Sequence, residues 1–178
     1  MFNNLVAVVA RAKQKLKDKG VEPSEVPLKI IHPLLEASAL EEEPDLQELW
    51  ANLLAGAASR TMPFLPAYID ILRHLSTEEV RFLTLMIQNL DKQITEWEKE
   101  EPEKQGRHPS ERLGFFGDLK SSFEEANGYP HGDEYAMFIK ASLDNVCRLG
   151  ILRQPSMGRP TYRLETFGAI FLEACIKL

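Results

Sequence analysis

The stretch that most constrains the fold runs from Leu46 to Ala58, where apolar residues recur at the spacing of an α-helix. Pro44 suits the first helical position, because the amide hydrogen that proline lacks has no partner there in any helix. The alanines and the glycine of the stretch would let a second helix approach closely. We therefore expect a helix that buries one face, made of Leu46, Leu49, Trp50, Leu53, Leu54 and Ala57.

Trp50 is the largest apolar side chain of this face. It has two alternative roles, an anchor of the hydrophobic core or one wall of a ligand site. We favour the core, because a tryptophan at helical spacing among leucines typically packs inside a helical protein.

Length and charge limit the class of protein. The chain has 178 residues, 44% of them hydrophobic, which is typical of one globular domain with or without a small appendage. Its net charge of -6 argues against non-specific nucleic-acid binding by the whole surface but leaves room for a local basic face. The two cysteines, Cys147 and Cys175, lie far apart and favour reduced thiols in a cytosolic protein.

The N-terminal apolar run from Leu5 to Ala10 follows no basic residue, so its pattern is wrong for a signal peptide. No uncharged apolar stretch approaches the roughly 18 residues of a membrane-spanning helix. We expect a cytoplasmic protein whose first helix packs on the core. Peripheral membrane contact through Leu5, Val8 and Val9 is the less favoured alternative.

The N-terminal two thirds of the chain predict a helical bundle. Ser76 and Glu79 match a capping box, in which each side chain bonds an amide that the start of a helix leaves free. The stripe of apolar residues that follows them, which we call the seam, is the clearest in the chain. It contains Val80, Leu83, Ile87, Leu90, Ile94 and Trp97. Helices are expected over 3–19, from a kink near Pro33 to residue 40, over 44–58, over 66–75 and over 77–99.

The C-terminal third predicts a smaller unit. After a charged, exposed loop at 98–111 and a weaker helix at 112–126, Asp133 is expected to cap a helix. Two short strands at 151–154 and 161–164 then flank a loop at 155–160, and Thr166 caps a last helix. The inner face of the Asp133 helix is expected to hold Tyr135, Phe138, Ala141, Val146 and Leu149.

The predicted fold class is therefore mainly α. A helical bundle at 1–127 is expected to precede a winged-helix-like unit with a two-stranded hairpin at 128–178.

Three stretches together resemble one protein family. They are Leu46 to Ala55 with its Leu-Trp-Ala-x-Leu-Leu-Ala core, the run Leu75-Ser76-Thr77-Glu78-Glu79, and Leu149-Gly150-Ile151 followed by Leu164-Glu165-Thr166-Phe167-Gly168. The chain resembles the Abi-alpha (abortive-infection alpha) family of bacterial proteins associated with defence against phage. The resemblance implies a helical fold and a defence setting, and it brings no catalytic residues. Members often carry a segment before a helix like the first one here, so we expect a short member or a fragment.

Motifs of catalysis are absent from the sequence. No arginine precedes a histidine at the four-to-six-residue spacing of HEPN ribonucleases, and no Gly-rich phosphate loop or His-Glu-x-x-His is present. His131 and Asp133 are interpreted as part of a turn rather than as metal ligands. Cys147 is interpreted as a small buried hydrophobe rather than as a nucleophile. We therefore expect no catalytic residues, no metal site and no cofactor.

One local feature is basic. The segment from Asn145 to Arg163 contains no acid, and its arginines are Arg148, Arg153, Arg159 and Arg163. One interpretation is phosphate contact by a wing. The favoured one is a solvated hairpin with charged edges, because Asp144 and Glu165 flank the segment.

The leading functional hypothesis is a non-enzymatic interaction module in phage defence, with an unidentified protein partner. The alternative is a nucleic-acid-binding regulator that uses the C-terminal unit, and an enzyme ranks third. A homo-oligomer is compatible with either of the first two.

Overall fold

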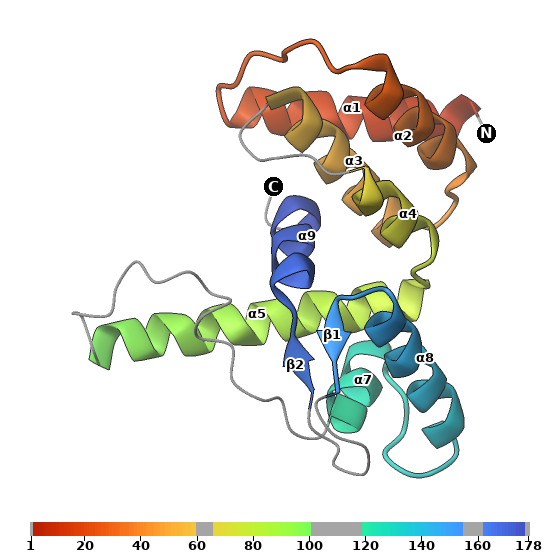
Figure 1. The fold of residues 1–178 in the computed structure, drawn as a ribbon, viewed down its shortest axis with the longest axis vertical. Helices are drawn as coiled ribbons and strands as arrows, with labels where there is room; N and C mark the ends of the chain where they lie inside the picture. Colours follow the sequence, from red (N-terminus) through yellow and green to blue (C-terminus); the bar gives the residue numbers. More distant parts are fainter. Residues whose placement is uncertain (1, 60–65, 101–118, 155–161, 177–178) are drawn as a thin grey trace. The chain divides into compact units, whose positions relative to one another are not determined.

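The computed structural model describes residues 2–59, 66–100, 119–154 and 162–176, and the side chains of Phe2 and of residues 93–100 are left out. These residues are mainly helical, with one two-stranded antiparallel hairpin (Figure 1), so the predicted fold class is confirmed. In chain order the elements are α1 (Phe2–Asp18), α2 (Leu28–Leu40), α3 (Pro44–Ser59), α4 (Ala67–Arg73), α5 (Thr77–Glu100), α7 (Leu119–Asn127), α8 (Ala136–Arg148), β1 (Leu152–Arg153), β2 (Arg163–Leu164) and α9 (Thr166–Ile176). No helix within the described ranges is long and apolar enough to cross a membrane.

The chain forms two compact units. The first contains Met1–Thr77 with Phe171–Leu178, and the second contains Glu78–Ile170. These units differ from the expected division at residue 127. The boundary between independently folding domains, and the winged-helix character of the C-terminal part, stay predictions.

Helix α3 is the centre of the first unit. Every residue from Leu49 to Ala58 is buried, and helices α1, α2 and α4 all contact it (Figure 1). The expected single buried face was therefore too narrow, because Ala51, Ala55 and Gly56 on the other sides are buried as well. A helix that is apolar all round belongs inside a protein. The short side chains let the neighbouring helices approach α3 closely.

Trp50 lies in this core, as expected. Only 1% of its surface is exposed, and its indole nitrogen has no hydrogen-bond partner among the described residues. Its contribution to stability therefore comes from packing rather than from hydrogen bonding.

The end of the chain completes the first unit. The side chain of Asn52 on α3 donates a hydrogen bond to the carbonyl of Cys175, which lies 123 residues further along the chain. The ring of Tyr68 on α4 lies 5.7 Å from the ring of Phe171 on α9. The C-terminal half of α9 is therefore part of the same core as α3 and α4.

The expected start of regular helix near Pro33 was wrong. Helix α2 begins at Leu28 and runs through Pro33. A proline inside a helix removes one hydrogen bond, here the one to the carbonyl of Lys29. Lys29 is exposed, so water can replace the lost amide at that position.

In the second unit, α5 buries the predicted seam residues Val80, Leu83, Ile87 and Leu90. The two remaining seam residues, Ile94 and Trp97, lie outside the described side chains. The expected loop at 98–111 and the start of the weaker helix at 112 also fall largely outside the described residues. Helix α7, which begins at Leu119, places Phe123 with its ring 5.4 Å from that of Phe82 on α5.

Two predictions about α8 were wrong. Asp133 does not cap the helix, which begins at Ala136 without a side-chain cap, because the Asp133 carboxylate binds Lys120 instead. The expected inner face was right at Val146 but wrong at two other positions. Phe138 and Ala141 are exposed, whereas the buried positions are Ile139, Ser142, Leu143 and Val146.

The hairpin pairs Leu152 with Leu164 and Arg153 with Arg163, and the two leucines are buried. Gly168 on α9 lies against the backbone of Ile151 just before β1. A Cβ atom at Gly168 would stand 2.6 Å from the Cα of Ile151 and closer still to its carbonyl oxygen. Only glycine allows this close approach between α9 and the hairpin.

Trp50→Ala tests the core of the first unit. Removing the buried indole should lower the free energy of unfolding by about 3–5 kcal/mol, because the surrounding helices only partly close the cavity. Thermal or urea unfolding measures the loss. The matched control is Leu40→Ala on α2, which should change stability little because Leu40 is 66% exposed. Equal stability of the two variants would contradict the core role of Trp50.

Candidate functional site

The exposed face of the hairpin carries two of the four arginines singled out in the sequence. Arg153 and Arg163 are directly opposite each other and both are exposed. Directly opposed residues of an antiparallel pair have Cβ atoms about 4.5–5.5 Å apart, and like charges there repel. The hairpin therefore concentrates positive charge on one small face.

These two arginines differ in their partners. The Nε atom of Arg153 lies 2.8 Å from Oε1 of Glu165, the residue that follows β2. Arg163 has no ion pair or hydrogen bond to another side chain of the described residues. Arg163 is therefore the guanidinium on this face that is open to an external anion.

Arg148 has a role inside the unit. Its Nη2 donates to Oδ1 of Asn145 at 2.8 Å. The side-chain Nδ2 of Asn145 in turn donates to both carboxylate oxygens of Glu79 at 3.0 Å. Glu79 is buried, and a buried carboxylate needs such partners. Arg148 thus supports the link between α8 and the start of α5. Arg159, the fourth predicted residue, lies outside the described residues.

A second surface, which the sequence analysis missed, surrounds the start of α8. Met137 is 89% exposed and Phe138 is 45% exposed. Beside them the rings of Tyr129 and Tyr135 stack at 4.5 Å, and the ring of Phe138 lies edge-on to that of Tyr129 at 6.3 Å. We call these four residues the aromatic surface. The sequence did contain a signal for this surface. The buried face of the helix can also be placed so that Ile139, Leu143 and Val146 turn inward.

A hydrogen bond and an ion pair link the loop that carries the two tyrosines to α7. His131 Nδ1 lies 2.7 Å from Oε2 of the buried Glu124 on α7, and Lys120 Nζ lies 2.9 Å from Oδ1 of Asp133. The hydrogen bond from Lys120 lowers the pKa of the Asp133 carboxyl. His131 and Asp133 therefore have separate partners. Among the residues that the structure describes, no group of three or more His, Cys, Asp or Glu side chains is placed to hold a metal.

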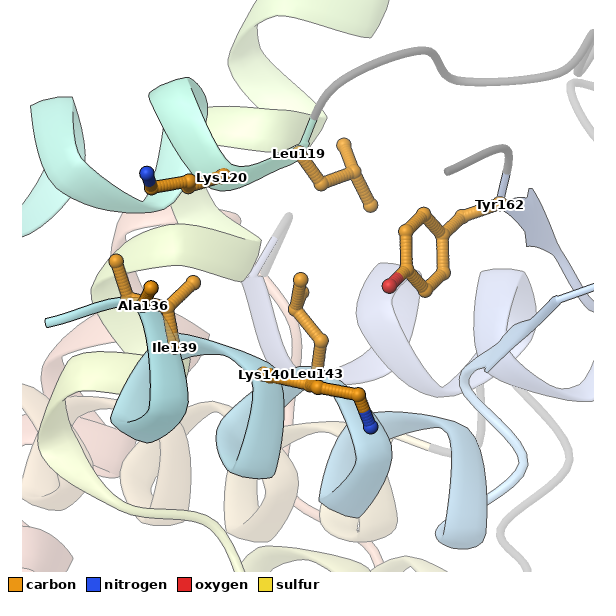
Figure 2. A pocket seen from close by; sticks show the side chains of 7 residues that line it. All are labelled: Leu119, Lys120, Ala136, Ile139, Lys140, Leu143 and Tyr162. Atoms are coloured by element: carbon orange, nitrogen blue, oxygen red, sulfur yellow. The ribbon is translucent and has the colours of Figure 1, made fainter. Parts of the chain in front are cut away.

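A cavity of about 220 Å³ lies between α7, α8 and the residue before β2. The side chains of Leu119, Leu143 and Tyr162 point toward one another in it (Figure 2). Lys120 and Lys140 also line it, but Lys120 binds Asp133 and Lys140 binds Asp144 at 2.8 Å, an interaction that raises the pKa of Lys140. The lysines thus offer the cavity mainly their methylene groups.

The two cysteines are poor nucleophiles in this fold. Burial raises the pKa of the Cys147 and Cys175 thiols, so both stay protonated at neutral pH. Cys175 is fully buried in the first unit, whereas Cys147 is only partly buried, less than the sequence predicted.

Comparison with known proteins identifies the family. No curated protein and no solved structure matches the chain significantly. The family model described as abortive infection alpha matches residues 4–175, which is nearly the whole chain. That range includes α3, the start of α5 and the hairpin with α9, where the three characteristic stretches lie. The chain therefore belongs to the abortive infection alpha family.

Proposed function

We propose that this protein is a non-enzymatic interaction module in defence against phage, and that it binds a protein partner through the aromatic surface. The name of the family suggests the defence setting. The observation that carries the proposal is the exposure of Met137 and Phe138 next to the stacked Tyr129–Tyr135 pair.

The chemistry of this surface suits partner binding. Aromatic residues and methionine are enriched in the cores of protein interfaces, and a few such residues supply most of the binding energy. Partners often lose affinity because loops must become ordered when they bind. Here the contact of His131 with the buried Glu124 and the stacking of Tyr129 on Tyr135 already order part of the loop, so less order has to be gained.

Met137→Asp tests this proposal. A charge on the most exposed side chain of the surface should reduce protection against phage in a plaque assay at least tenfold, because burying an unpaired carboxylate at an interface is unfavourable. The melting temperature should be unchanged, since Met137 is almost fully exposed. Leu40→Asp on α2 is the matched control, because it places the same charge at another exposed apolar position.

Full protection by a stably folded Met137→Asp protein would contradict the role of the aromatic surface. Equal loss with Leu40→Asp would show that any added charge on an exposed apolar side chain is harmful, which would also contradict it.

The alternative function, a nucleic-acid-binding regulator, is favoured by a different observation. Arg153 and Arg163 lie side by side on the exposed face of the hairpin, and Arg163 is available for a phosphate. Guanidinium groups bind phosphate through two parallel hydrogen bonds.

Arg163→Ala tests the alternative. It should weaken binding to duplex DNA of any sequence and make the slope of log K against log salt shallower by about 0.9, the effect of one lost phosphate contact. Fluorescence anisotropy over a salt series measures both quantities. Arg73→Ala on α4, which removes an arginine that pairs with Glu36, should leave the slope unchanged. A wild-type protein that binds no DNA at low salt would remove this function.

A further inference from the structure

We propose that Glu165 is an internal competitor of phosphate, and that its ion pair with Arg153 limits the hairpin to one open anion-binding arginine. The inference rests on the nucleic-acid-binding function proposed above, and it assigns a regulatory residue to that site. The ligand group is a phosphate of a nucleic-acid backbone.

The geometry of the hairpin places Glu165 where it can compete. The pairing of the two strands continues past β2, because the amide of Glu165 donates to the carbonyl of Ile151 at 3.0 Å. Arg153 is directly opposite Arg163, so Glu165 is the diagonal neighbour of Arg153. Diagonal neighbours are within reach of long side chains, and here the contact is made at 2.8 Å.

The charge balance explains why the contact exists. Without Glu165, two positive side chains would repel each other across the hairpin. Glu165 neutralises Arg153 and leaves Arg163 as the net positive charge of the pair. The fold thus gains a hairpin with little internal repulsion, and an approaching phosphate finds one free guanidinium instead of two.

The contact is also able to open. The side chain of Arg153 is 60% exposed and that of Glu165 is 33% exposed. The contacting Oε1 atom of Glu165 is buried, but the contact lacks hydrogen-bond geometry, so it holds the more exposed Arg153 side chain only weakly. A phosphate already held by Arg163 is therefore able to draw Arg153 away from the carboxylate. Removal of the negative charge of Glu165 should leave Arg153 free to form a second contact with phosphate.

Glu165→Gln in the full chain tests the inference, because the amide keeps the shape of the side chain and loses its charge. Binding to a fluorescein-labelled DNA duplex should show a slope of log K against log salt steeper by about 0.9, as expected for one added contact. That slope corresponds to about a 3.5-fold larger loss of affinity between 50 and 200 mM salt than in the wild type. In an Arg153→Ala background, Glu165→Gln should have no effect on the slope.

Asp144→Asn is the matched control. It changes the net charge equally and breaks the Lys140–Asp144 ion pair on α8 instead of the Arg153–Glu165 pair of the hairpin. The slope should stay at the wild-type value. An equal steepening in both variants would overturn the proposal, because the effect would then come from net charge alone.

Three further outcomes separate this inference from the function on which it rests. If Arg163→Ala weakens DNA binding and Glu165→Gln changes nothing, the competitor role is wrong and the DNA-binding function stands. If neither the wild type nor Glu165→Gln binds DNA at low salt, both are wrong. Binding of Glu165→Gln to phosphatidylglycerol vesicles but not to DNA would overturn the assignment to nucleic acid.

Discussion

Helix α3 is buried on every side from Leu49 to Ala58, so the first unit must supply apolar neighbours all round it. Helices α1, α2 and α4 do so, and the C-terminal half of α9 adds the carbonyl that Asn52 binds. The small residues of α3 make this arrangement possible, because large side chains there would hold the neighbouring helices apart. The stability of the first unit therefore depends on residues that are distant in sequence.

The two candidate surfaces lie in the second unit, and the rings of Tyr129 and Phe138 in the aromatic surface also pack against the buried ring of Phe123. The aromatic surface spans the loop before α8 and the first turn of α8, and the contacts of Glu124 with His131 and of Lys120 with Asp133 link that loop to α7. The basic face is on the hairpin, whose other face is anchored by Leu152 and Leu164. The exposed side chains of Met137 and Arg163 are the ones that can be changed with little effect on folding.

The helices were largely predictable, because the periodicity around Trp50 and along α5 marks their extent, although the burial of α3 on every side exceeds the one face that periodicity indicates. The site was less predictable. On α8 the apolar residues form two overlapping stripes, and the stripe with Phe138 looked stronger although Ile139, Leu143 and Val146 are buried. The four arginines looked equivalent in sequence. Their different partners, Asn145 for Arg148 and Glu165 for Arg153, come from contacts that only the folded chain makes.

The central claim is that α3 organises the first unit, and native-state hydrogen exchange tests it most directly. Amides of buried, fully bonded helices exchange only when the whole unit opens, whereas peripheral helices exchange by local fraying. The amides from Leu49 to Ala58 should be the slowest of residues 2–77, and those of α1 and α2 should be faster. Exchange of the α3 amides at the same rate as those of α1, or faster, would contradict the account.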